Sequence, residues 1–213
     1  MRFSRSFKLL INFIRLTLAG AIVLAIILHS WANLLIIILA VILTFLPEWV
    51  EKKYNIYIPL GFEFAVVLLI YASLFLGEVG RFYERFWWWD VFLHSFSSIA
   101  FSCLSFIALF FLFKADKIKG RPIWIAIFSF CFSVAISTLW EIFEFFMDQT
   151  FGFNMQKSGL MDTMGDLISA SGSALLVATI GYFYLKSDQK TILHRWLDWI
   201  IKKIFHDRQI KKI

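Results

Sequence analysis

The sequence is poor in cysteine, proline and charged residues, and these shortages narrow the class of protein. Its 213 residues include 2 cysteines and 3 prolines, and 17% are charged, whereas a soluble domain is about one quarter charged. Cys103 and Cys131 both lie in apolar runs and offer no metal-type spacing, so we expect two small buried side chains. No low-complexity segment or fixed-period repeat is present, which leaves no sign of a repeat architecture.

Apolar residues make up most of what remains: 60% of the chain is hydrophobic and 19% is aromatic. Because a helix needs about 20 mostly apolar residues to cross a bilayer, the runs predict six transmembrane helices. We expect a single all-α, polytopic membrane domain covering residues 1–213. The predicted spans are about 9–28, 32–46, 58–76, 90–113, 123–146 and 162–185.

The N-terminus resembles a signal peptide, since Arg2, Arg5 and Lys8 precede an apolar core. The apolar stretch is long for such a peptide, however, no Ala-x-Ala site follows it, and another apolar run begins at once. We therefore expect an uncleaved first transmembrane helix.

Basic residues are concentrated in alternate loops of this predicted topology. With the N-terminus in the cytoplasm, all of the 21 Lys and Arg residues except Arg81, Arg85 and Lys157 fall in cytoplasmic segments. The positive-inside rule then predicts that both termini are cytoplasmic. This distribution accounts for the net charge of +6 without a nucleic-acid partner.

Two segments are predicted to lie at the membrane surface. Residues 78–89 are rich in Trp and Tyr, which favour the headgroup level, and we expect an aromatic belt on the outer surface. The alternative is a lipid-headgroup site formed by Arg81 and Arg85. Residues 190–207 place apolar side chains on one helical face and basic ones on the other, which predicts an amphipathic helix on the anionic inner leaflet.

Polar residues follow one face of each of the last three predicted spans. Because consecutive spans run antiparallel, the start of the fourth, the end of the fifth and the start of the sixth lie on one side of the membrane, which the predicted topology makes the outer side. Helical spacing of three to four residues puts the acids of each span on a common face. The predicted site residues are Asp90, His94, Glu141, Glu144, Asp162 and Asp166, with Ser137 and Asp148 on the same stripe as the two glutamates.

Acids gathered at one depth repel each other, by about 3 kcal/mol for a pair at about 5 Å and an effective dielectric of about 20. A bound cation, protonation of some acids, or exposure to bulk water would relieve this repulsion. Carboxylates suit Mg²⁺, Ca²⁺ or Mn²⁺, and an imidazole favours Mn²⁺, Fe²⁺ or Zn²⁺, so we expect a divalent cation held by the six site residues. The alternatives are that His94 is a hydrogen-bonded structural residue, and that Asp90 and Asp162 only complement helix N-termini.

Three motifs are shared with a known family, and the chain resembles the YjdF-type bacterial inner-membrane proteins from about Phe82 to Leu185. A fainter similarity to VanZ-like membrane proteins covers only the last span. The resemblance implies a multi-span protein of the bacterial cytoplasmic membrane, and it implies no reaction. The motifs are Asp90-x-x-x-His94 after aromatic residues, Glu141-x-x-Glu144 after Trp140, and Asp162-Thr163-x-x-Asp166.

Three functions are compatible with these patterns. The first is a metal-dependent enzyme acting on a lipid or lipid-linked phosphate, with His94 and Glu144 as catalytic residues, because metal-bound carboxylates polarise phosphoryl groups or activate water and histidine serves as a general acid or base. The second is a transporter for a cation or a cation-coupled solute, and the third is a non-catalytic lipid-binding factor. Membrane lipids, and a lipid-linked or small-molecule substrate, are the expected partners.

Overall fold

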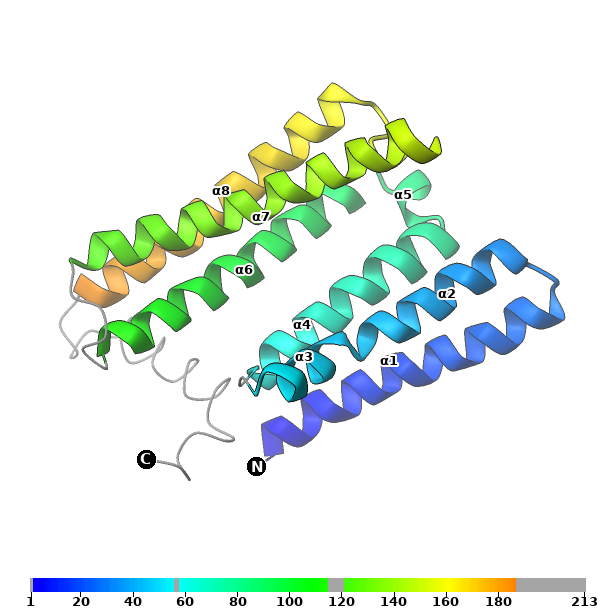
Figure 1. Ribbon diagram of the computed structural model, residues 1–213, viewed down its shortest axis with the longest axis horizontal. Coiled ribbons are helices and arrows are strands. Elements are labelled where there is room, and N and C mark those ends of the chain that lie inside the picture. The colour runs from blue at the N-terminus through cyan, green and yellow to red at the C-terminus, as the bar shows by residue number, and fades with distance from the viewer. Residues whose placement is uncertain (1, 56–57, 115–120, 187–213) are drawn as a thin grey trace. The chain divides into compact units, whose positions relative to one another are not determined.

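The computed structural model describes residues 2–55, 58–114 and 121–186, all as helices and short connections, with no strand in these ranges (Figure 1). Six helical segments are long and apolar enough to cross a membrane, which confirms the predicted all-α, multi-pass architecture. The amphipathic helix expected at residues 190–207 lies outside the described residues. The elements are α1 (Arg2–Ile27), α2 (Trp31–Thr44), α3 (Leu46–Tyr54), α4 (Leu60–Ile70), η1 (Tyr71–Val79), α5 (Phe82–Arg85), α6 (Trp89–Lys114), α7 (Pro122–Phe151) and α8 (Leu160–Lys186).

The chain divides into two compact units, and the boundary falls between Trp89 and Asp90. In the first unit α1, α2 and α4 pack together around an aliphatic core. The members of that core are Ile11, Ile14, Leu18, Ala25, Ile37, Ala40 and Val67.

The helical run that contains the second predicted span continues to Tyr54 after a break at Phe45. Pro47 lies in the first turn of α3, where its missing N–H is tolerated. Arg15 of α1 contacts residues on both sides of this break. Its guanidinium donates to the Thr44 carbonyl oxygen at 2.7 Å, pairs with Glu48 at 2.9 Å, and lies over the Phe45 ring.

The predicted surface segment 78–89 folds back on η1, a stretch wound as a π-helix. The Tyr83 hydroxyl lies 2.9 Å from Ser73 Oγ, and its ring covers Gly77, where an added Cβ would clash with it. Arg81 pairs with Glu84 and both side chains are largely exposed. Tyr83 therefore holds this segment against η1, and one of the segment's two arginines is paired within it.

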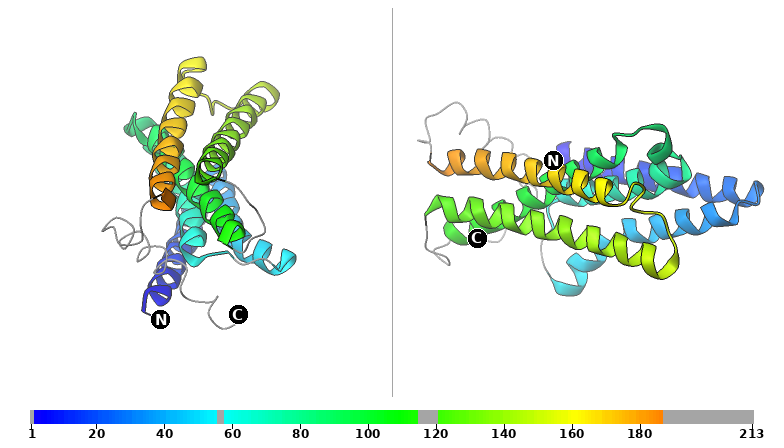
Figure 2. Two further views of the ribbon diagram at one scale, coloured as in Figure 1. Left: turned by 90° about the vertical axis from the view of Figure 1, so that its left-hand side faces the viewer. Right: turned by 90° about the horizontal axis from the view of Figure 1, so that it is seen from above.

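In the second unit α7 and α8 run antiparallel and in contact along much of their length (Figures 1 and 2). α6 is joined to both by hydrogen bonds: Ser98 Oγ donates to the Ala170 carbonyl oxygen of α8, and Ser133 Oγ of α7 donates to the Ser98 carbonyl oxygen. Gly181 of α8 lies directly against the Phe106 ring, with no room for a Cβ. The expectation of two buried cysteines is wrong for Cys131, which lies on the exposed face of α7, and Cys103 is half-buried.

Candidate metal centre

The helical stripes predicted from spacing face the interior of the second unit. On α7, Ser137, Glu141 and Glu144 are buried, whereas the intervening Leu139, Phe143 and similar apolar side chains are exposed. On a membrane-spanning helix these exposed apolar residues suit lipid. The polar stripe is thus turned away from the apolar faces, as expected for intramembrane acids.

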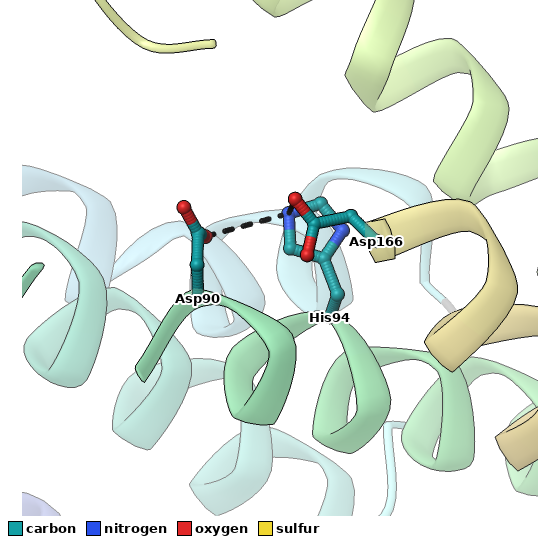
Figure 3. Close-up of side chains that lie close together, drawn as sticks. All are labelled: Asp90, His94 and Asp166. Carbon is teal, nitrogen blue, oxygen red and sulfur yellow. Dashed lines mark ion pairs between the residues drawn. The ribbon is translucent and has the colours of Figure 1, made fainter. Parts of the chain in front are cut away.

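His94 stands at the centre of the cluster. Its Nε2 lies 3.6 Å from Asp90 Oδ1 and 3.9 Å from Asp166 Oδ2, while its Nδ1 lies 3.5 Å from Glu141 Oε1. Figure 3 shows Asp90 and His94 on α6 with Asp166 reaching them from α8. Both imidazole nitrogens therefore face carboxylates.

Two groups of possible ligands overlap at this histidine. One consists of Asp90, His94 and Asp166, and the other of His94, Glu141 and Glu144; within each group one ligand atom per residue lies within 4.8 Å of the others. His94, Glu141, Glu144 and Asp166 are buried, and Asp90 is half-buried. Such spacing is short enough for each group to share one ion.

Glu141 has an unusual environment. Its side chain is 4% exposed, and neither carboxylate oxygen has a hydrogen-bond partner among the described residues. The polar side chains near it, Gln156 and Thr163, hydrogen-bond each other at 2.7 Å. Burying a carboxylate without hydrogen bonds costs free energy, and oxygens of this kind could coordinate a divalent cation.

Glu144 is oriented by an aromatic neighbour. The indole Nε1 of Trp140, one helical turn earlier, donates to Glu144 Oε1 at 2.8 Å. Trp140 engages one of the two carboxylate oxygens, so the other remains for a cation or a substrate.

Lys157 lies at the rim of the cluster, with its Nζ 3.1 Å from Asp90 Oδ2. Asp148 holds the surrounding loop in place, because its two carboxylate oxygens accept the backbone N–H groups of Met155 and Gln156 at 2.7 and 2.9 Å. Gly152, with φ 68°, ends α7 in a left-handed conformation that glycine adopts without strain. The role of Asp148 is therefore in the loop, outside both ligand groups.

Five of the six predicted site residues thus belong to the two ligand groups, and one lies outside them. The structure brings together Asp90, His94, Glu141, Glu144 and Asp166, whereas Asp162 is half-buried in the first turn of α8 and belongs to neither ligand group. The Lys157 contact and the orienting bond from Trp140 were not expected from the sequence. Trp140 precedes Glu144 by four residues, and this spacing could have indicated that contact.

Comparison with known proteins agrees with the sequence motifs. A family model described as "Predicted membrane protein (DUF2238)", which is the YjdF-type family, matches residues 10–187. An uncharacterised protein of Thermotoga maritima is 34% identical over 111 residues, which cover 47% of this chain and 53% of the relative. The match thus spans about half of the relative's length. No solved structure matches the chain.

Proposed function

We propose that this chain, which belongs to the YjdF-type family of predicted membrane proteins (DUF2238), binds a divalent cation and uses it on a lipid or lipid-linked phosphate. The observation that carries the proposal is the buried pair of ligand groups sharing His94, in which the Glu141 carboxylate faces His94 Nδ1 at 3.5 Å and makes no hydrogen bond within the described residues. The residues proposed to hold the cation are Asp90, His94, Glu141, Glu144 and Asp166, with Asp162 at the margin.

The donor set fits a hard or borderline divalent ion. Four carboxylates and one imidazole suit Mn²⁺, Mg²⁺ or Zn²⁺, with Ca²⁺ as a further candidate. A bound cation would polarise a phosphoryl oxygen and lower the pKa of a coordinated water. Glu144 is proposed to take a proton from the attacking water, since Trp140 fixes its orientation, and His94 to return a proton to the leaving group.

The lipid part of the proposal is supported by the surroundings of the site. The centre lies near the ends of three membrane-spanning helices, whose outward faces are apolar. A substrate with acyl chains could remain in the bilayer while its headgroup reaches the site. Lys157 at the rim supplies a positive charge that suits a phosphate.

A thermal-unfolding experiment in detergent tests the cation site. Wild type should gain stability in at least one of Mn²⁺, Mg²⁺, Ca²⁺ or Zn²⁺ relative to chelator, by about 2.7 kcal/mol at a cation concentration of about 100 times Kd. Glu141→Gln and Asp166→Asn should lose this gain while remaining folded in chelator. Glu63→Gln is the matched control, because Glu63 is a buried acid of the first unit.

A wild type indifferent to all four metals, with both variants equally or more stable, would exclude the cation site. The catalytic step is tested separately, by phosphate release from a short-chain lipid phosphate in the presence of the stabilising metal. Glu144→Gln should abolish release. Metal binding without release would point to the non-catalytic lipid-binding alternative or to transport.

Transport of a cation or a cation-coupled solute is the second candidate function. It is favoured by a line of buried serines that continues inward from His94 on α6 and from Glu141 on α7. Uptake of the stabilising metal into proteoliposomes, with no phosphate release, would favour this candidate over the enzyme.

The orientation of the protein is also proposed, with both termini in the cytoplasm of a bacterial inner membrane and the cluster near the outer surface. The distribution of Lys and Arg supports it. Reporter fusions after Ile213 and in the loop near Lys157 should give cytoplasmic and periplasmic activity, respectively. The reverse result would place the cluster on the cytoplasmic side.

A further inference from the structure

A line of serines fills the interior of the second unit below the acidic cluster. Each member lies on the buried face of α6 or α7, and four of them have no exposed surface. We call this line the serine row; it consists of Ser98, Ser102 and Ser105 on α6, and Ser129, Ser133 and Ser137 on α7.

The row continues the spacing of the cluster itself. On α6 the half-buried Asp90 and the buried His94, Ser98 and Ser102 recur every four residues. On α7 the same interval separates the buried Ser129, Ser133, Ser137 and Glu141. From Asp90 to Ser105 the helix rises about 22 Å, which is about three quarters of a hydrocarbon core of about 30 Å. The serines thus extend the polar interior deep into the membrane.

At the centre of the row, the hydroxyl groups of Ser98 and Ser133 each have one proton but more than one acceptor within hydrogen-bonding distance. Ser133 Oγ lies 2.8 Å from both Ser98 Oγ and the Ser98 carbonyl oxygen, and Ser98 Oγ donates to the Ala170 carbonyl oxygen at 2.6 Å. A hydroxyl has one proton and can both donate and accept. Each can therefore change its donor direction by rotation, which is what relay of a proton along hydroxyls requires.

Ser102 gives the second, independent indication. Its side chain has no exposed surface, and its Oγ has no hydrogen-bond partner among the described residues. Close helix packing explains why a small side chain lies here. Alanine would serve that purpose equally well, as Ala170, Ala174 and Ala178 do on α8. Packing therefore does not explain the unpartnered hydroxyl of Ser102. A buried polar group of this kind is normally satisfied by an internal water.

We propose that the serine row, completed by water at Ser102, is part of a proton path that crosses the membrane interior from the His94 end of the second unit. The path requires no bound metal. It therefore goes beyond the proposed enzyme and survives or fails independently of it. Rows of polar side chains inside membrane proteins commonly serve as proton relays.

Proton flux into liposomes tests the path. Purified protein is reconstituted with an entrapped pH-sensitive dye, and a potassium diffusion potential set by valinomycin drives protons inward, with chelator present. Wild type should exceed protein-free liposomes several-fold, and Ser102→Val should reduce the flux to near the protein-free level. Ser97→Ala is the matched control. Ser97 lies on the same helix, is half-buried and donates a hydrogen bond to the His94 carbonyl oxygen. Proton flux through the Ser97→Ala variant should equal that of wild type.

Wild-type flux no greater than that of protein-free liposomes, or an unchanged flux in Ser102→Val, would overturn the proposal. Ser102→Val must also keep the thermal-unfolding midpoint of wild type in chelator, which separates a blocked path from a damaged fold.

Cysteine accessibility provides a second test, which remains valid if the Ser102→Val variant does not fold. In a background carrying Cys103→Ala and Cys131→Ala, Ser102→Cys keeps the size of the side chain and should react with a small water-soluble thiol reagent. The reaction should slow proton flux several-fold. Ala40→Cys, in the apolar core of the first unit, should remain unmodified. An unreactive Ser102→Cys would show a dry row and overturn the proposal.

Discussion

The two units of this protein bury different kinds of side chain. The core of the first is aliphatic and is formed by α1, α2 and α4, and its few polar groups include Arg15, Thr44 and one buried acid, Glu63. The interior of the second contains a histidine, three buried acids and the serine row. Both are helical, and both consist of helices long and apolar enough to cross a membrane.

The comparison distinguishes the side chains that stabilise the fold from those that serve a function. Lipid is as apolar as leucine, so an aliphatic core gains mainly from close packing. A polar interior gains hydrogen bonds, but it also carries the cost of burying acids. Because the first unit shows that this chain can pack helices with aliphatic side chains, packing alone does not require the acids of the second unit.

The largest difference in stability is expected when an acid is added to the core of the first unit and a charge is removed from the interior of the second. Val67→Asp puts an acid at a fully buried position of the aliphatic core and should destabilise the protein by about 3 kcal/mol or more. Asp166→Asn removes a charge from the acidic cluster and should leave the protein folded without metal. Yield of monodisperse protein in detergent, followed by thermal unfolding, measures both.

Equal loss of folded protein in the two variants would contradict this contrast. It would mean that the charge of Asp166 is required for the fold, as a partner of His94, and that the second unit is stabilised by its ion pairs.

Packing in the first unit should give the next largest effect. Leu18 has no exposed surface, and Leu18→Ala should cost about 2 to 3 kcal/mol. This is the low end of the range for buried leucines, because exposure to lipid in the unfolded state carries no hydrophobic penalty. Leu16→Ala is the control on the same helix, since Leu16 is 69% exposed, and it should change stability by less than about 0.5 kcal/mol. Similar losses in both would argue against the core assigned to the first unit.

Much of this contrast was predictable from the sequence, for identifiable reasons. Helical spacing placed Glu141 and Glu144 on one face, and antiparallel connectivity placed them beside Asp90, His94 and Asp166. Neither inference depends on the side chains between the helices. The break at Phe45 was missed because it depends on Arg15, which is distant in the sequence.

Contacts made by loops and hydroxyl groups were not predictable in the same way. The pairing of Lys157 with Asp90 depends on how the loop after Gly152 turns back, and Asp148 directs that turn by accepting two backbone N–H groups. Ser129 and Ser133 carried no clear signal, since serine is also used where transmembrane helices pack closely. Their significance becomes visible only when α6 and α7 are placed side by side.

Hydrogen bonding in the serine row should contribute less to stability than the aliphatic core. Ser133→Ala removes the hydroxyl that bonds Ser98, and should cost about 1 kcal/mol, in line with buried hydrogen bonds in membrane proteins, which average about 0.6 kcal/mol. Reversible unfolding by SDS in mixed micelles measures it. Ser97→Ala, outside the row, is the control. A loss as large as that of Leu18→Ala would mean that the row is primarily structural.

The smallest effect on stability, and the sharpest test of the acidic cluster, is expected at its rim. Lys157 is 34% exposed and pairs with Asp90, so its charge competes with any cation that uses the same carboxylate. Lys157→Gln should change stability little, because partly exposed ion pairs contribute about 0.2 to 1 kcal/mol.

The same substitution should tighten binding of the stabilising metal about 3- to 10-fold at low salt, which corresponds to about 0.7 to 1.4 kcal/mol of electrostatic repulsion removed. Because mobile ions screen a pair this exposed, the gain should shrink as salt rises from about 0.02 M to about 0.5 M. Isothermal titration with Mn²⁺ at both salt concentrations measures it, with Lys186→Gln at the far end of α8 as the control. Weaker binding in Lys157→Gln would reverse the assignment of roles: Lys157 would then hold Asp90 in place for the cation, and the loop anchored by Asp148 would be part of the binding site.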